Sequence, residues 1–436
     1  MGEILLHIGL PKTGTSALQE FLAINKNALI NKGLLYDHFV EGNYGKAHYQ
    51  LVQILLSDFN ESRKNPLNNE LFPNTKQFFD TINNSMLINN CKKSIISVET
   101  LGQLGPDLLF THLKYDQDLI QSFEDFCIRA IVKTLTDLNL DFKVIFYVRR
   151  QDERIESWYN QILKDGFENL TKKKTDITAY FDEWKYWFDS YKQYEKWNKV
   201  IIKDNIIVRI YEKQQLTGDI VSDFFANVLK LSTENLTHPV KNIRTENTRL
   251  GRDVLEYKRI IDLLDVDSSN TSVTHMMHSI SEDMGNRDNY KSFLSLSDRK
   301  MILDFYFQSN YNLAKEYFGR EDGKLFYEEL PEIVEENEHY AGLTVDKAIE
   351  ISERLRAIER NSMLAMHNDY KMKSESQLEL LLSEQQKIWN QIVHIVGEQQ
   401  TIKELLANNI SEHTTVEDYS ISRKITKTFR KFFKSK

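Results

Sequence analysis

Short apolar runs alternate with helical patterns through the first half of the chain. Four runs are rich in β-branched or aromatic residues and predict buried strands: Ile4–Leu10, Ser94–Val98, Val144–Val148 and Ile206–Ile210. Runs without polar alternation are typical of parallel strands that are covered on both faces. Helical patterns separate them, at about Thr15–Asn31, 76–90, 115–138, 151–164, 177–198 and 219–230. This order predicts an α/β fold with a three-layer α/β/α core around a central parallel sheet.

The rest of the chain is expected to be mainly helical. Two further helices are predicted at about 249–264 and 297–317. The polar segment Asn60–Asn74, which contains two prolines, is expected to be a surface loop. His7, in the first predicted strand, is expected to be a core histidine.

A heptad spacing predicts a helical extension after this core. Residues four and three positions apart form one stripe: Leu381, Gln385, Ile388, Ile392, Ile395, Gln399, Ile402 and Leu406. An earlier stripe has the same spacing: Ile351, Leu355, Ile358, Ser362 and Ala365. We therefore expect a helical linker over 331–376 and a coiled coil over 377–408, through which the chain forms a homodimer. A single amphipathic helix that folds back on the core is the alternative explanation.

The segment 409–436 predicts a basic amphipathic tail. Residues 422–436 hold seven basic residues and no acidic one. One helical face carries Ile421, Ile425, Phe429, Phe432 and Phe433. A helix of this kind can lie on an anionic membrane surface, which predicts peripheral membrane contact. A frayed, solvated chain end is the alternative.

Composition excludes several classes of protein. The chain has 436 residues, of which 41% are hydrophobic, and this is enough to build a core. A net charge of −8 argues against nucleic-acid binding through phosphate neutralisation. The two cysteines, Cys91 and Cys127, are far apart and fit neither a disulfide framework nor a metal site. With no signal segment and no long apolar run, a cytoplasmic protein is expected, peripheral at the inner membrane face if the tail binds lipid.

The strongest chemical signal is the segment Gly9–Ser16, which follows the first strand and begins the first helix. Two glycines five residues apart allow the backbone to curl around an anion, and the helix N-terminus then faces that anion. In the loops of ATP- and GTP-binding proteins a lysine follows the second glycine. Here Thr15 holds that position and the lysine is Lys12, between the glycines. The usual NTPase geometry is therefore not specified.

This segment resembles the 5′-phosphosulfate-binding loop of sulfotransferases that use 3′-phosphoadenylyl sulfate (PAPS). The resemblance rests on the sequence PKTGTS, and on Arg149 at a strand end with Ser157 eight residues later. In the family this second pair holds the 3′-phosphate. Arg150 and Gln151 stand where the family often has asparagine and proline. The resemblance covers about residues 3–330 and implies a P-loop-like sulfotransferase domain over 1–330.

The resemblance implies a set of site residues. PAPS, as co-substrate, would be bound by Pro11, Lys12, Thr13, Gly14, Thr15, Ser16, Arg149 and Ser157. Lys12 would act as the catalytic cation on the leaving group, and no metal ion is expected. Two candidates exist for the general base: Glu99, directly after the strand Ser94–Val98, and His48 on a neighbouring segment.

The acceptor is expected to be a hydroxyl on a bacterial-type glycan, of the envelope or capsule or of a lipid-linked precursor. Several aromatic residues could stack on a sugar ring: Tyr36, His38, Tyr44, Tyr49 and Trp158. Two alternatives remain. One is a P-loop nucleotide or sugar kinase; the other is a non-enzymatic assembly protein that carries the coiled coil.

Overall fold

The computed structural model describes residues 2–37, 46–64, 72–102, 104, 117–165, 176–239, 250–263, 271–284, 292–330, 340, 342–362, 364, 383 and 387. The chain divides into two units, Met1–Leu355 and Arg356–Lys436. In the second unit, residues 356–362, 364, 383 and 387 are helical. Nearly all of the expected coiled coil and the whole basic tail lie outside the described residues. The homodimer, the membrane contact and the domain boundaries at 330, 376 and 408 therefore stay predictions.

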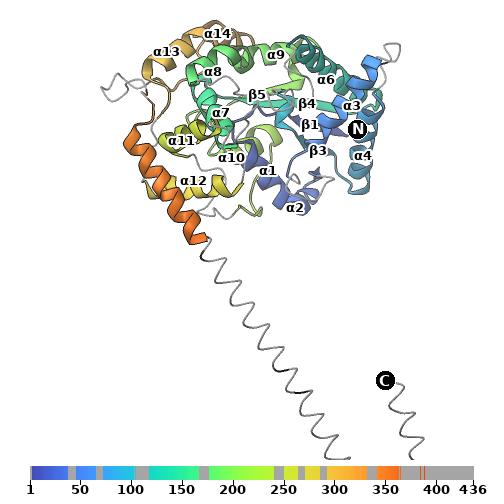
Figure 1. Cartoon of the computed structure of the whole chain (residues 1–436). Helices are drawn as coiled ribbons and strands as arrows, with labels where there is room; N and C mark the ends of the chain where they lie inside the picture. The colour runs from blue at the N-terminus through green and yellow to red at the C-terminus, as the bar shows by residue number, and fades with distance from the viewer. Residues whose placement is uncertain are drawn as a thin grey trace, which may run out of the picture. The chain divides into compact units, whose positions relative to one another are not determined.

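A five-stranded parallel sheet forms the centre of the first unit (Figure 1). Its strands are β1 (Glu3–His7), β2 (Leu34–Leu35), β3 (Lys93–Ser97), β4 (Asp141–Val148) and β5 (Ile206–Ile210), in the order β2-β3-β1-β4-β5. All four pairings are parallel. The predicted α/β fold with a central parallel sheet is confirmed. The two-residue strand β2 was not expected, because it is too short to produce a pattern.

Helices cover both faces of the sheet. Ile4 and Leu6 of β1 belong to a core cluster that includes side chains of α3 (Gln50–Lys64), α4 (Pro73–Ile88), α6 (Gln117–Asp137) and α9 (Ser190–Asn198). Leu5 belongs to a second cluster with α1 (Thr15–Ile24), α2 (Lys26–Ile30), α10 (Ile220–Asp223) and the π-helix Phe224–Leu229. Alternate residues of one strand thus face opposite helical layers, as the period of a strand requires. Figure 1 shows α6 and α9 above the sheet and α1 and α2 below it.

Four predicted segments were wrong in their extent. The helix expected over Thr15–Asn31 divides at Asn25, whose side-chain amide bonds to the Thr237 backbone. The loop expected over Asn60–Asn74 begins and ends in helix, because α3 continues to Lys64 and α4 begins at Pro73. The helices expected over 177–198 and 297–317 each divide into two. The pieces are α8 (Ile177–Trp184), the 3₁₀ turn Lys185–Phe188, α9, α13 (Leu296–Phe305) and α14 (Phe307–Glu316).

One local and one tertiary contact explain two of these divisions. The Asp189 carboxylate accepts hydrogen bonds from the backbone N–H groups of Tyr191 and Lys192, so α9 has its own N-cap. Tyr306, between α13 and α14, is fully buried and donates its hydroxyl to the Lys185 carbonyl. Neither contact has a periodic signal in the sequence. The remaining helices are α7 (Gln151–Asp165), α11 (Arg252–Leu263), α12 (Thr271–Asp283), which was not predicted, and a helical stretch over 345–355 at the end of the first unit.

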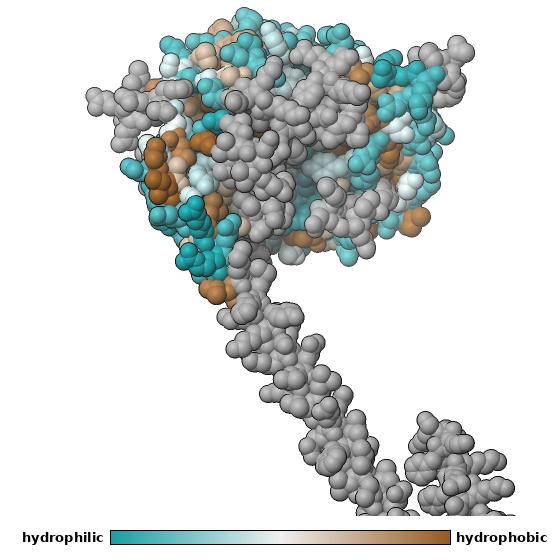
Figure 2. Space-filling model, viewed as in Figure 1, coloured by the Kyte–Doolittle hydropathy of each residue, from teal (hydrophilic) through white to brown (hydrophobic). Residues whose placement is uncertain are grey.

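The surface of the described part is mixed in polarity. Figure 2 shows hydrophilic residues over much of the visible face, with hydrophobic residues in scattered groups. Among the described helices, none combines the length and the apolar character needed to cross a bilayer. Cys91 and Cys127 are both buried free thiols.

His7 is buried on the underside of the sheet, as expected for a core histidine. Its Nδ1 lies 2.9 Å from Oγ of Ser97, and its ring packs edge-on against Tyr147 and Phe224. Burial lowers the pKa of His7 from 6.5 to about 4. His7 therefore becomes protonated below about pH 6.5 in the unfolded chain, but only near pH 4 in the folded chain. The contribution of His7 to stability is complete above pH 6.5 and is lost as the pH falls toward 4.

We predict that this titration contributes about 3 kcal/mol to acid destabilisation. The free energy of unfolding in urea should be measured at pH 7 and pH 4 for the wild type and for His7→Gln, which retains a hydrogen-bonding group. The wild type should lose about 3 kcal/mol more than the variant, because only the wild type contains the buried imidazole. An equal loss in both proteins would contradict the prediction.

Candidate functional site

The segment Gly9–Ser16 leaves the carboxyl end of β1 alongside β4. Hydrogen bonds of the parallel ladder continue past the last strand residue, from Ile8 N to Ile145 O (2.9 Å) and from Leu10 N to Tyr147 O (3.3 Å). Tyr147 N in turn donates to Gly9 O (2.7 Å). The start of the loop is therefore fixed to β4 by backbone contacts.

The order of the strands makes this point a candidate for ligand binding. After β1 the chain goes to β2 on one side of the sheet, whereas after β4 it goes to β5 on the other side. In open parallel sheets, ligands bind outside the carboxyl ends of two neighbouring strands whose connections separate in this way. The residues that follow β1 and β4 are therefore the natural candidates for a binding site.

Two glycines give the loop its shape. Gly9 and Gly14 have φ angles of 99° and 83°. A Cβ atom at Gly9 would lie 3.0 Å from the backbone of Glu99, and one at Gly14 would lie 3.1 Å from the ring of Tyr211. Lys12 also has a positive φ, 68°, which costs a residue with a side chain about 1 kcal/mol. The tight turn thus requires both glycines and strains the lysine.

The loop ends at the N-terminus of α1. Gly14 is the N-cap residue, and its carbonyl accepts from Ala17 N (3.1 Å) and Leu18 N (3.3 Å). The N–H groups of the first turn point away from the helix body, and together with the helix dipole they favour an anion. The hydroxyl of Thr13 donates to the Leu10 carbonyl (2.6 Å) and so closes the turn, whereas Ser16 is exposed.

Arg149 links the end of β4 to this loop. Its Nη1 donates to the Lys12 carbonyl (3.2 Å) and its Nε donates to Oε2 of Glu153 (2.9 Å). The guanidinium also lies over the ring of Tyr211, 5.7 Å from its centroid, just past β5. With 16% of its side chain exposed, Arg149 remains reachable from outside.

Helix α7 presents one polar face to the loop. Nζ of Lys12 donates to Oε1 of Gln161 (3.0 Å), and Arg149 contacts Glu153 of the same helix. Ser157 is four residues from both Glu153 and Gln161, so it shares their face. Ser157 is partly exposed. The structure therefore brings Lys12, Arg149 and Ser157 to one crevice.

Glu99 lies on the other side of the loop. It begins a 3₁₀ turn directly after β3, and Thr15 donates its hydroxyl to Oε2 of Glu99. The Tyr49 hydroxyl donates to Oε1 at 2.8 Å. Two donors thus fix the carboxylate at the start of α1. The Thr15 hydroxyl is engaged with Glu99, which differs from the expected direct role in cofactor binding.

His48 does not join this cluster. Its Nδ1 accepts from Ser97 N (3.1 Å), so Nε2 carries the proton and lies 2.6 Å from the Asp37 carbonyl. The side chain is completely buried. In this arrangement both ring nitrogens bond to the backbone, so His48 supports the end of β3 and does not face a substrate. This arrangement has no signature in the sequence, since a histidine on a loop has the same pattern in either role.

Buried carboxylates hold α7 in place. Arg150 binds Asp152 through two hydrogen bonds (2.8 and 3.1 Å), and Arg299 of α13 bridges Asp152 and Glu156. Burial alone would raise the pKa of Asp152, but the two guanidinium groups lower it below its ordinary value. Arg150 also donates to the Glu328 carbonyl (2.8 Å). Arg150 is therefore a structural residue, and of these two arginines it is Arg149 that contacts the loop.

Sequence reasoning missed several contact residues. Glu153, Gln161 and Tyr211 all touch Lys12 or Arg149, and Tyr49 was considered only as a stacking aromatic. The four-residue spacing of Glu153, Ser157 and Gln161 was a usable signal, because it places all three on one face of α7. Within the described ranges, no group of three or more His, Cys, Asp or Glu side chains is arranged to hold a metal ion.

Comparisons with known proteins do not reveal a family. No protein-family model matches the chain, and no solved structure matches it. An uncharacterized protein of Archaeoglobus fulgidus is 26% identical over 244 residues, which cover 53% of this chain and 61% of that relative. The match therefore spans less than two thirds of the relative's length, and function must be argued from the site.

Proposed function

We propose that the chain transfers a sulfuryl group from PAPS to a hydroxyl of a carbohydrate acceptor. The observation that supports this most is the hydrogen bond from Arg149 to the Lys12 carbonyl. This bond joins the turn Gly9–Ser16 after β1, which is shaped to bind an anion, to the guanidinium of Arg149 after β4. The chain leaves β1 and β4 toward opposite sides of the sheet, so ligands are expected to bind between their ends. Two anionic groups of one ligand can be bound there at once.

Each end of PAPS would have its own partners. The 5′-phosphosulfate would lie against the turn Pro11–Ser16 and the first N–H groups of α1, beside Lys12. The 3′-phosphate would accept hydrogen bonds from Arg149 and Ser157, because a guanidinium fork fits phosphate oxygens. Lys12 and Arg149 now contact Gln161 and Glu153, so the ligand would replace or share these contacts.

The same residues suggest a route for the chemistry. The acceptor hydroxyl would attack sulfur in line, forming one S–O bond while the S–O bond to the 5′-phosphate breaks. Lys12 would stabilise the negative charge that develops on the phosphate oxygen. Glu99, fixed by Thr15 and Tyr49, would accept the hydroxyl proton. The scheme uses a lysine where a kinase uses a metal ion, so it calls for no metal.

The product 3′-phosphoadenosine 5′-phosphate is predicted to bind tightly to the wild type. Calorimetric titration of the full chain should show that Arg149→Ala weakens this binding at least about 100-fold, since the 3′-phosphate loses its charged partner. A parallel titration uses ATP with magnesium. Preferred binding of ATP would support the kinase alternative, and binding of neither would support an assembly protein. Either result would overturn the proposal.

Glu153→Gln is predicted to tighten binding of the same bisphosphate by about three- to tenfold. The carboxylate competes with phosphate for Arg149, and the amide retains its size without its charge. Adenosine 5′-phosphate is the matched control ligand, because it lacks the phosphate assigned to Arg149. Its affinity should not change. An equal gain for both ligands would show a general charge effect and would contradict the placement of the 3′-phosphate.

Lys12→Ala and Glu99→Gln are each predicted to lower turnover by about 10²- to 10⁴-fold. Turnover is measured as the transfer of radiolabelled sulfate from PAPS to glycans and to small phenols. Glu99→Gln should keep bisphosphate affinity within about threefold, since the amide is isosteric and Glu99 follows β3, which β1 separates from the strand that ends at Arg149. Full activity in Glu99→Gln would exclude this base. Transfer to phenols alone would exclude the carbohydrate acceptor.

A further inference from the structure

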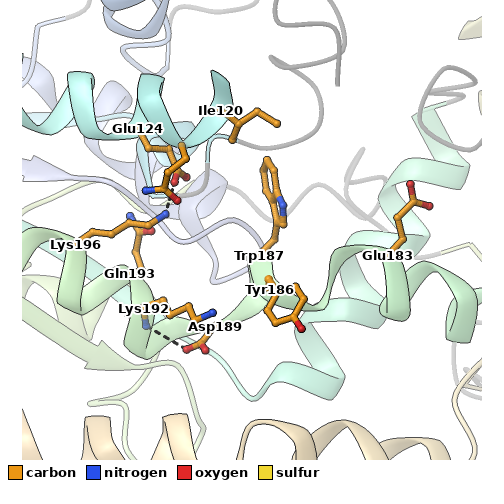
Figure 3. Close-up of a pocket in the computed structure, with 10 residues that line it drawn as sticks. Ile120, Glu124, Glu183, Tyr186, Trp187, Asp189, Lys192, Gln193 and Lys196 are labelled. Atoms are coloured by element: carbon orange, nitrogen blue, oxygen red, sulfur yellow. Dashed lines mark hydrogen bonds and ion pairs between the residues drawn. The ribbon is translucent and has the colours of Figure 1, made fainter. Parts of the chain in front are cut away.

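A second pocket lies outside the crevice just described. It lies between the first half of α6, the helix α9 and the 3₁₀ turn Lys185–Phe188, and its volume is about 200 Å³ (Figure 3). Its lining includes Ile120, Glu124, Tyr186, Trp187, Gln193 and Lys196. This volume is below the roughly 300–1,000 Å³ of pockets that enclose drug-sized ligands, so the pocket suits a single small ring.

Aromatic side chains form one wall of this pocket. Figure 3 shows Trp187 and Tyr186 close together, with Glu124, Gln193 and Lys196 opposite them. Tyr186 is 62% exposed, an unusual position for a large aromatic residue. The ring of Trp184 packs edge-on behind Trp187, with centroids 5.4 Å apart. Aromatic surface therefore lines this side of the pocket, and the Trp187 ring is supported by the Trp184 ring.

Polar groups form the opposite wall. Glu124 of α6 and Lys196 of α9 form an ion pair, with 15% and 24% of their side chains exposed. Gln193 is 9% exposed and lies one turn before Lys196. Carboxylate, amide and ammonium groups side by side can accept from and donate to neighbouring hydroxyls of one ring. Apolar faces with convergent polar groups are the composition of small-molecule sites.

The walls are fixed by contacts to the rest of the fold. Asp189 caps α9 through two backbone N–H groups and also accepts from the Ser309 hydroxyl (2.7 Å). Tyr306 holds the Lys185 carbonyl, and Arg154 of α7 lies over the Phe188 ring, 5.2 Å from its centroid. Both ends of the aromatic turn are thus attached to the core. A preformed wall lowers the entropic cost of binding.

The charge of the lining restricts the ligand. Glu124, Glu183 and Asp189 are acidic, and Lys192 and Lys196 are basic, so one negative charge remains in excess. Nζ of Lys192 lies over the Tyr186 ring, 4.9 Å from its centroid. An anionic ring would meet net repulsion, whereas a neutral or cationic ring would not.

We propose that this pocket binds a single neutral or amino sugar ring. The aromatic wall would stack on the C–H face of the sugar, and Glu124, Gln193 and Lys196 would bind its hydroxyls. In parallel α/β units the helix that follows a strand begins near the carboxyl edge of the sheet, and the first half of α6, which follows β3, lines the pocket. This side of the pocket therefore lies toward the edge that carries Lys12 and Arg149. Identifying this sugar as part of the acceptor glycan rests on the proposed function; the sugar site itself does not.

Saturation-transfer NMR on the full chain tests the proposal with glucose, galactose, glucosamine, N-acetylglucosamine and glucuronate as probes. At least one neutral or amino sugar should receive saturation on its ring C–H protons, and glucuronate should receive less. Trp187→Ala and the exposed Tyr186→Ser should each raise the dissociation constant about tenfold or more. Lys12→Ala should leave the signal unchanged, which separates this site from the proposed chemistry.

A charge reversal provides a second, independent test. Glu183→Lys, at an exposed lining position, should weaken glucosamine binding and strengthen glucuronate binding. Asp182→Lys is the matched control, because Asp182 is exposed, adjacent in sequence and absent from the lining. No saturation of any sugar at millimolar concentration would overturn the proposal. So would equal signals in Trp187→Ala and the wild type, a preference for glucuronate in the wild type, or equal effects of the two lysine substitutions.

Discussion

The pairing of β1 with β4 is the constraint on which the candidate site depends. The ladder continues beyond both strands, so the turn after β1 cannot move independently of β4. Because the chain leaves these strands in opposite directions, no connecting segment of either crosses the gap between their ends. Arg149 then bonds to the Lys12 carbonyl across that gap. Two segments more than a hundred residues apart thus become one surface.

Helix α7 completes this surface because buried ion pairs hold another face of the helix in place. Asp152 and Glu156 are almost fully buried, and such carboxylates are tolerated only where cations compensate them. Arg150 and Arg299 supply that compensation from two directions. These ion pairs fix the orientation of the helix, and a neighbouring face of it keeps Glu153 and Gln161 against the cations of the loop. The buried ion pairs and the residues that face the loop thus lie on two faces of one helix.

The sequence predicted what depends on local pattern and missed what depends on tertiary contact. Buried strands such as Val144–Val148 and the glycine turn at Gly9 and Gly14 have short-range signatures, so both were recognised. The breaks at Asn25 and Tyr306 depend on partners far along the chain, which no periodicity records. The same reason explains His48, whose ring nitrogens bond to backbone atoms of two other segments. In the sequence, Trp187 has the pattern of an ordinary core aromatic residue, and only the structure shows that it lines a pocket.

The end of β3 shows how such contacts limit evolutionary change. Gln19 donates to the Ser97 hydroxyl (3.1 Å), that hydroxyl bonds to His7, and the backbone N–H of Ser97 donates to His48. Four positions from three distant segments therefore form one epistatic unit. Loss of a buried hydrogen bond in this unit costs stability, so a change at one position favours a compensating change at another. Glu99 follows two residues after Ser97, so the position of Glu99 depends on these four residues together.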